Sequence, residues 1–328
     1  MRTAVIFTGA LRTVKKTMRY FKQNVLRPNV QVFICVQNDT AESEDSWNQW
    51  FKGEIGGQIK SIDWFSLEKY PEWVKLRDLQ LSHIHLPEMW SNYLRSSGSM
   101  IEYFQLQLAY MKMCYDEQIS GCKYDYIIRA RTDSIYAKPV DFHWLNWTEE
   151  EVAKRVEDVK EEMEQSKIET SANTILNYFM CTILSDDLIP NIQRIYASRY
   201  DCEGDLLPHL QKEVSFEKAL HQYITKGRYM LTLRKNNLYI VRRSLFYLIP
   251  SLGTMYGFHK SADSDNYWFN AEGQFRDACK YSCITLYDYG TAFEETSLEY
   301  GNKWIHAKFF DPNFNCINPY MLYCVVRR

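Results

Sequence analysis

Hydrophobic positions at the start of the chain alternate between continuous runs and a helical repeat. The apolar runs at 3–8 and 30–36 are typical of strands that are covered on both faces, as in a parallel sheet. Between them, apolar residues recur every three or four positions from Val14 to Val25, which predicts a helix that ends before Pro28. The first residues therefore predict a β-α-β unit.

The next segments extend this alternation. A strand is expected at 58–65, a long irregular insertion at 66–97 and a buried strand at 124–129. Ser99 and Glu102 have the spacing of a capping box, which predicts a helix before the last of these strands. The stripe of this helix that we expect to be buried consists of Ile101, Phe104, Leu108, Met111 and Tyr115.

Beyond residue 140 the pattern is mixed. Thr148 and Glu151 form a second capping box, which opens a highly charged helix expected to be exposed to solvent. Its thin apolar line consists of Val152, Val156, Val159 and Met163. Further expected elements are a strand or strand pair at 173–184, helices at 186–200 and 213–226, and a strand at 229–241. Together these elements predict one α/β domain over 1–328, with a mixed, mainly parallel sheet flanked by helices and with insertions.

Composition narrows the function classes. The net charge is -2, so no broad basic surface for nucleic acid is expected. Aromatic residues make up 15% of the chain, which suits stacking on bases or sugar rings but equally a tyrosine-rich core. The nine cysteines include no CxxC pair, and no signal peptide or membrane span is evident. We therefore expect reduced, mostly buried thiols in a soluble, cytoplasmic protein.

The strongest candidate chemistry lies in "YDYIIRARTDSIY", residues 124–136. In an extended chain, residues two apart share a face, so Arg129, Arg131 and Asp133 are expected to point the same way. Two guanidiniums at the carboxyl end of a sheet strand suit phosphate oxygens, and a carboxylate beside them suits a divalent cation. The alternative is an internal salt bridge among these residues or with another acid.

The loop after the first strand is a second candidate. In "FTGALRT", Gly9 and Ala10 would allow a ligand close to the backbone, and Arg12 follows at the start of a helix, whose N-terminus favours anions. Neither a Gly-Lys phosphate loop nor GxGxxG is present, which disfavours adenylate and dinucleotide binding. The alternative is a tight strand-to-helix turn with no ligand.

Three segments together, "AVIFTGALRT", "MIEYFQLQLAYMKMCYDEQ" and "KYDYIIRARTDSIY", resemble a loosely defined group of bacterial and giant-virus glycosyltransferase-like proteins. In that group, Arg-x-Arg-x-Asp lies where GT-A nucleotide-sugar transferases carry Asp-x-Asp. The resemblance covers residues 3–36 and 99–139. It implies a GT-A-like, Rossmann-like fold, with 1–140 as the nucleotide-sugar-binding half and 141–328 as the acceptor-side half.

The resemblance also implies roles for particular residues. Asp133 matches the last Asp of Asp-x-Asp, which usually contacts the metal, so Asp133 is the expected ligand of Mn²⁺ or Mg²⁺. Arg131 stands where the first Asp would be, so an arginine could instead neutralise the diphosphate and make the cation less necessary. Thr8, Gly9 and Arg12 match the turn that receives the nucleotide.

Candidates for the acceptor side come from the second half of the chain. Glu272 follows an aromatic segment and is the first choice of catalytic carboxylate, with Asp187 and Asp186 as the second choice. Each of these acids could instead serve a helix N-terminus. His259 could reach phosphate or metal, or could be a structural histidine.

The sequence therefore predicts an enzyme that transfers a sugar from a nucleoside-diphosphate sugar, such as a UDP-sugar, to a glycan or other hydroxyl acceptor. The alternative is a catalytically inactive nucleotide- or glycan-binding protein that retains the fold. The substituted Asp-x-Asp motif is the feature that favours this alternative.

Overall fold

The computed structural model describes most of the first half of the chain and parts of the second. The described residues are 1–82, 98–137, 139–140, 143–168, 171–182, 198–200, 212, 215–233, 238–251, 275, 278–288, 311, 313, 315 and 323–325.

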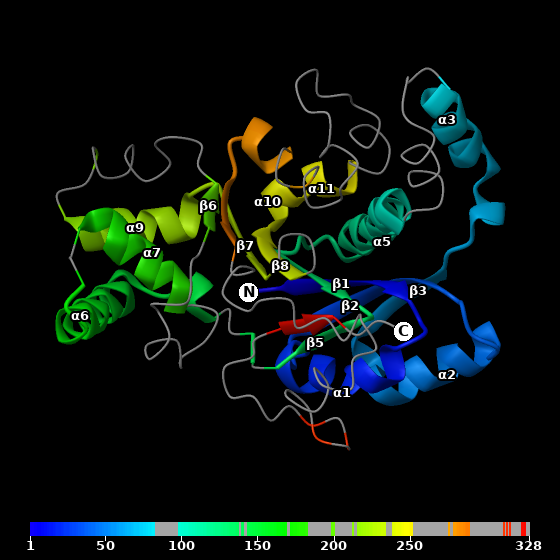
Figure 1. Ribbon diagram of the computed structural model, residues 1–328, viewed down its shortest axis with the longest axis horizontal. Helices are drawn as coiled ribbons and strands as arrows, with labels where there is room; N and C mark the ends of the chain where they lie inside the picture. Colours follow the sequence, from blue (N-terminus) through cyan, green and yellow to red (C-terminus); the bar gives the residue numbers. More distant parts are fainter. Residues whose placement is uncertain are drawn as a thin grey trace.

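A mixed sheet forms the centre of the protein (Figure 1). Its eight described strands lie in the order β3-β2-β1-β4-β8-β7-β9-β6. They are β1 (Thr3–Ala10), β2 (Val30–Gln37), β3 (Ile59–Trp64), β4 (Tyr126–Arg131), β6 (Ser198–Tyr200), β7 (Tyr229–Leu233), β8 (Leu238–Arg242) and β9 (Thr285–Asp288). Strands β1 to β4 are mutually parallel, whereas β8 is antiparallel to β4 and β7. The predicted α/β class with a mixed sheet is confirmed, and both halves of the chain contribute to this one sheet.

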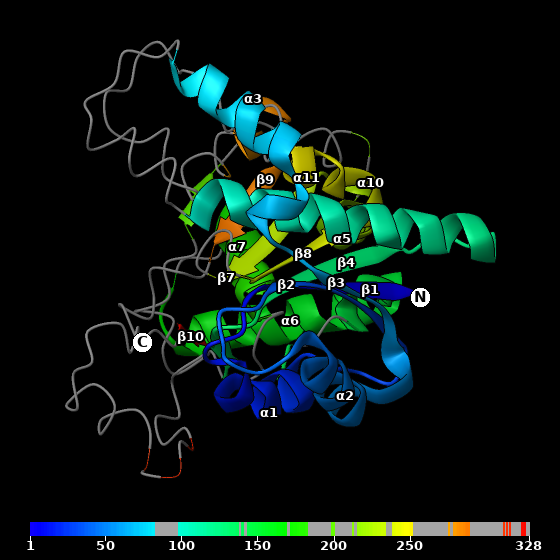
Figure 2. The same cartoon turned by 90° about the vertical axis from the view of Figure 1, so that its right-hand side faces the viewer.

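Helices cover both faces of the sheet (Figures 1 and 2). One face carries α1 (Val14–Asn24), α2 (Glu44–Ile55), α6 (Glu149–Gln165), α7 (Ala172–Thr182) and α9 (Phe216–Lys226). The other face carries α3 (Pro71–Ser82), α5 (Gly98–Ser120), α10 (Arg243–Phe246) and α11 (Leu248–Ser251). Within the described part of the chain, no helix combines the length and the apolar character needed to cross a bilayer.

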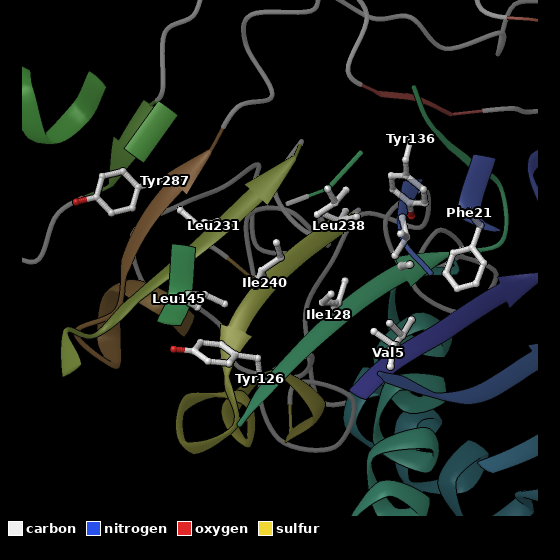
Figure 3. Packing of buried hydrophobic residues seen from close by; sticks show 14 of the residues in the cluster. Val5, Phe21, Tyr126, Ile128, Tyr136, Leu145, Leu231, Leu238, Ile240 and Tyr287 are labelled. Atoms are coloured by element: carbon white, nitrogen blue, oxygen red, sulfur yellow. The ribbon is translucent and has the colours of Figure 1, made fainter. Parts of the chain in front are cut away.

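Alternation along the strands divides the core between the two faces. Val5, Ile128, Ile240 and Leu231 are in register across β1, β4, β8 and β7, and they form one buried row (Figure 3). The intervening residues, such as Ile6, belong to the core on the opposite face. Because both faces are buried, these strands appear in the sequence as continuous apolar runs.

Several expected elements are confirmed and others are wrong. The Thr148–Glu151 capping box is present at the start of α6. The apolar line of α6 is fully buried rather than exposed, because this helix packs on α7 and α9. The expected strand at 173–184 is the helix α7, in which Ile175, Leu176, Phe179 and Met180 are buried at helical spacing.

The remaining differences concern three segments. The expected insertion at 66–97 contains a 3₁₀ turn at Leu67–Lys69 and the helix α3, and 83–97 lies outside the described residues. Of the helix expected at 186–200, only the last three residues are described, and they form the strand β6. The strand expected at 229–241 is the antiparallel pair β7 and β8.

The buried face of α5 differs from the expected stripe. Of that stripe, Phe104 is buried and Ile101 and Leu108 pack against the core, as expected. Met111 and Tyr115 are 58% and 61% exposed, and the fully buried residues are Tyr103, Leu106, Ala109 and Met113. The polar residues Gln105 and Glu117 share this buried face, so the hydrophobic pattern alone indicates a different face of the helix. The Ser99 side chain of the expected capping box lies outside the described residues.

Cysteine burial is also lower than expected. Of the five described cysteines, which are all free, only Cys35 and Cys279 are buried, and Cys122 and Cys283 are exposed.

Candidate functional site

Three parallel strands end at the same edge of the sheet and define the candidate site. The chain runs outward from β1 to β2 and β3, then returns to place β4 on the other side of β1. Open α/β sheets bind ligands at the carboxyl ends of strands beside such a reversal. The strand ends here carry Gly9 and Ala10 of β1, Gln37 of β2 and Arg131 of β4.

A cavity of about 320 Å³ lies at this edge. It is bounded by the ends of β1, β2 and β4 and by the first turns of α5. Its lining consists of Gly9, Ala10, Arg12, Gln37, Ile101, Glu102, Gln105, Arg129, Arg131 and Asp133. This volume is at the lower end of the range of small-molecule sites.

The expected alternation along β4 is confirmed. Arg129 and Arg131 both face α5 and line the cavity, whereas Ile128 and Ala130 are buried in the core on the opposite face. The strand ends at Arg131, and Asp133 lies in the following turn. The two arginines are therefore placed by the strand itself, on a rigid support.

Ion pairs connect the charged groups of the cavity. The Nε and Nη2 groups of Arg131 donate to the two carboxylate oxygens of Asp133, each at 2.7 Å. Arg129, whose side chain is only 1% exposed, donates to Glu102 of α5. The other oxygen of Glu102 lies 3.5 Å from Nη1 of Arg131. The salt bridges that the sequence left open are thus present, and a cavity lies beside them.

Asp133 is kept ionised by its neighbours. It is 6% exposed, and burial alone would raise its pKa. The charge and hydrogen bonds of Arg131, together with the charges of Arg129 and Arg12, outweigh burial and lower the pKa of Asp133 below the ordinary 3.8. The carboxylate therefore serves as a permanent negative partner that fixes the orientation of Arg131.

This lowered pKa predicts a pH-dependent contribution to stability. A carboxyl group with a depressed pKa in the folded state contributes stability that is full above its ordinary pKa and is lost as the pH falls towards the lowered value. Urea unfolding at about pH 6 and about pH 3 should therefore show a smaller loss of stability in Asp133→Asn than in the native chain. An equal loss in both proteins would show that Asp133 contributes nothing to the acid sensitivity.

Tyr136 supports the same turn from within the core. Its fully buried hydroxyl accepts a hydrogen bond of 2.8 Å from the backbone N–H of Arg131. Burial raises the pKa of Tyr136 to about 12, so the phenol stays neutral.

Gly9 and Thr132 join the ends of β1 and β4. Gly9 has φ +138°, and a Cβ at this position would lie 2.3 Å from Oγ1 of Thr132. That hydroxyl donates to the carbonyl of Ala10 at 2.7 Å, and the backbone N–H of Thr132 donates to the carbonyl of Thr8 at 3.1 Å. A glycine is required here by the close approach of Thr132, whether or not a ligand also approaches.

The turn before α1 already holds a carboxylate. Oδ1 of Asp39 accepts from the backbone N–H groups of Leu11 and Arg12, each at 3.0 Å. The backbone N–H groups of Leu11 and Arg12, which could otherwise donate to an anionic ligand, therefore already have a partner. What this turn offers to a ligand is the side chain of Arg12 and the backbone of Gly9 and Ala10, which line the cavity.

The structure brings together five of the expected site residues, namely Gly9, Arg12, Arg129, Arg131 and Asp133. Thr8 is fully buried and does not line the cavity, and its hydroxyl has no hydrogen-bond partner among the residues that the structure describes. The expected residues Glu272, Asp187, Asp186 and His259 lie outside the described residues.

Four residues that line the cavity have no site role in the sequence analysis, namely Gln37, Ile101, Glu102 and Gln105. The spacing of Ile101, Glu102 and Gln105 places them on one face of α5, so a polar pair on an otherwise apolar helix was the available signal. The spacing of Ser99 and Glu102 instead predicts a capping box. Because that local role accounts for the carboxylate, the ion pairs of Glu102 with β4 were not expected.

A divalent cation does not fit the cavity while Arg131 occupies its observed position. Both oxygens of Asp133 bind Arg131, and both oxygens of Glu102 face arginines. Among the described residues, no group of three or more His, Cys, Asp or Glu side chains is arranged to hold a metal ion. Asp133 is therefore placed as the partner of Arg131 rather than as an available metal ligand.

Comparison of the sequence with known protein families and with curated proteins found no match. The functional argument therefore depends on the geometry of the cavity.

Proposed function

We propose that this chain is a glycosyltransferase with a GT-A-like fold, which transfers a sugar from a nucleoside-diphosphate sugar to a glycan or other hydroxyl acceptor. The observation that carries the proposal is the convergence of Arg12, Arg129 and Arg131 on one cavity at the carboxyl ends of β1 and β4. Three arginines against the two carboxylates of Glu102 and Asp133 leave one net positive charge. Such a site favours a ligand that is anionic at one end.

The chemistry of sugar transfer needs a fixed positive charge of this kind. The bond between the sugar carbon and the phosphate oxygen breaks, and its electron pair leaves with the diphosphate. Donors that are already oriented stabilise this developing charge without reorganisation. Asp133 and Glu102 hold Arg131 in place from two sides, so its orientation is set before a ligand arrives.

The acceptor hydroxyl forms the new bond to the sugar carbon and loses its proton to a base. We propose Glu272 for this role, with Asp187 or Asp186 as the second choice, and His259 as a possible phosphate contact. The carboxylates that line the described cavity, Glu102 and Asp133, are both ion-paired. This pairing is the observation that favours the second candidate function, a nucleotide- or glycan-binding protein without catalysis.

Ligand-dependent thermal stabilisation tests the proposal. UDP, GDP and CMP should be compared with and without Mn²⁺ and with a chelator, followed by hydrolysis assays with the matching sugar donors. A ligand at one hundred times its Kd stabilises the folded state by about 2.7 kcal/mol, which is readily measured. Stabilisation with donor turnover supports the enzyme, whereas stabilisation without turnover supports the binding protein. If no nucleotide stabilises the protein, the proposal is wrong.

Arg131→Lys should weaken the binding of a nucleoside diphosphate about tenfold, because an ammonium group cannot reproduce the planar two-pronged contact of a guanidinium with phosphate. It also cannot make both hydrogen bonds to Asp133. The matched control is Arg155→Lys on α6, where Arg155 pairs with Asp158 and Glu162 away from the cavity. Isothermal titration of both variants measures the effect, and equal affinity in both would assign Arg131 a purely structural role.

A further inference from the structure

We infer that Gln105, together with Gln37, forms an uncharged hydrogen-bonding subsite. This subsite binds a neutral group of the ligand, and that group carries both a hydrogen-bond donor and an acceptor. A nucleobase edge and the hydroxyls of a sugar share this chemistry. The inference rests on the proposed function for the identity of the ligand, but it depends on a separate observation.

That observation is a glutamine that is largely withdrawn from bulk water and whose side chain lines the cavity. Gln105 is 3% exposed, its side chain lines the cavity, and it makes no hydrogen bond within the described part of the chain. Its amide atoms reach the cavity, since neither is among the fully enclosed polar atoms that lack a partner. A ligand that fills the cavity would therefore meet both the donor and the acceptor of this amide, and leaving either without a partner there would cost about 1 to 3 kcal/mol.

The position of Gln105 on α5 places its side chain at the cavity. It lies one turn after Ile101 and Glu102 on α5, between the fully buried Tyr103 and Leu106 face of the helix and the ion pairs of β4. The neighbouring buried residues hold the helix against the sheet. The donor and the acceptor of Gln105 are therefore presented to a group inside the cavity.

Gln37 adds a second amide from another element. Its backbone carbonyl accepts from the N–H of Leu11 at 3.2 Å, which fixes the end of β2 beside the β1 turn. Its side chain lines the cavity and has no hydrogen bond within the described part of the chain. The cavity thus combines an ionic part, built from arginines and acids, with a neutral part built from two amides.

An amide group is suited to a particular class of partner. It offers N–H donors and a carbonyl acceptor side by side, so it matches a group with complementary atoms and discriminates against one that lacks them. Phosphate oxygens are acceptors only and are already served by guanidiniums. The amides are therefore expected to contribute to binding of the uncharged part of the donor.

Substitution of Gln105 by Leu, and by Met as a variant of similar length, tests the inference. Titration calorimetry with inorganic pyrophosphate should show affinities within about twofold of the native chain, because the arginines remain. Affinity for the nucleoside diphosphate that stabilises the native chain best should fall about 10- to 100-fold. Gln118→Leu is the matched control, since Gln118 lies on the same helix, is exposed and does not line the cavity.

Two comparisons identify which neutral group is read. Equal losses for the nucleoside diphosphate and for its sugar conjugate indicate the nucleoside, whereas a loss confined to the sugar conjugate indicates the sugar. Either result supports the inference. Equal losses for pyrophosphate and for all nucleotides, or no loss in any case, would overturn it.

The melting temperature of the ligand-free protein tests this inference independently of the proposed function. If Gln105 is kept for binding, Gln105→Leu removes no hydrogen bond of the described part of the ligand-free protein and should leave its melting temperature unchanged or slightly higher. A lowered melting temperature in both Gln105→Leu and Gln105→Met would show that the amide is structural. If the native chain binds no nucleotide, the proposed function fails, and nucleosides and free monosaccharides then decide the inference. Binding of one of them, weakened in Gln105→Leu, supports it, and binding of none overturns it.

Discussion

Gly9→Ala should lower the free energy of unfolding by about 2 to 4 kcal/mol. The reason has two parts, because φ of +138° is unfavourable for alanine and because the new Cβ would lie 2.3 Å from Oγ1 of Thr132. The side chain of Thr132 is fully buried and bonded to the carbonyl of Ala10, so it cannot move aside without losing that hydrogen bond. Urea denaturation of the variant measures the effect.

Two further substitutions separate the causes. In a Thr132→Ala background the oxygen that clashes is absent, so Gly9→Ala should cost only the backbone strain, about 1 to 3 kcal/mol. Gly53→Ala is the control, since Gly53 lies inside α2 with open space around it, and alanine there should leave stability unchanged or slightly higher. An equal cost of Gly9→Ala with and without Thr132 would exclude the clash as its cause.

Arg129→Met should lower the free energy of unfolding by about 3 to 5 kcal/mol. Arg129 is among the largest fully buried side chains, and its loss leaves Glu102 with the 3.5 Å contact to Arg131 as its other described ion pair. A carboxylate that loses its partner is costly where it is largely withdrawn from water, and the side chain of Glu102 is only 15% exposed. Because Arg131 still neutralises part of the charge, we expect the lower end of this range.

The double variant Arg129→Met/Glu102→Gln distinguishes a charge effect from a packing effect. Removing both charges should recover a large part of the lost stability, because no unpaired ion remains. Lys22→Met is the surface control, since the Lys22–Glu54 pair at 2.8 Å is 41% and 34% exposed and should contribute at most about 1 kcal/mol. If the double variant is no more stable than Arg129→Met, the packing of the arginine side chain, and not its charge, is what the core requires.

The parallel half of the sheet could be predicted from the sequence, because strands that are buried on both faces have mainly apolar residues along their whole length. Strands β1, β2 and β4 are mainly apolar runs, although Thr8, Gln31 and Arg129 lie within them. The second half could not be predicted as well. In α7 the apolar residues are so dense that helical and strand spacings both fit, and the contacts of α6 and α9 decide the outcome.

The candidate site was predicted in part for a similar reason. Spacing of two along an extended chain is sufficient to place Arg129 and Arg131 on one face. Their partner Glu102 comes from α5, and no local pattern shows which acid of a distant helix will lie over a strand end. Gln105 is the clearest case, because its spacing from Glu102 shows only that the two polar residues share a helix face, and the docking of α5 decides that this face lies against the cavity.

The short second sheet links the end of the described chain to the candidate site. β10 (Tyr323–Val325) pairs antiparallel with β5 (Ser134–Tyr136), which begins directly after Asp133. A purification tag fused just behind Val325 would therefore lie next to the turn that orients Arg131. Met1 is a better point of attachment, because it precedes the amino end of β1, about 25 Å along the strand from the cavity, and its side chain is exposed.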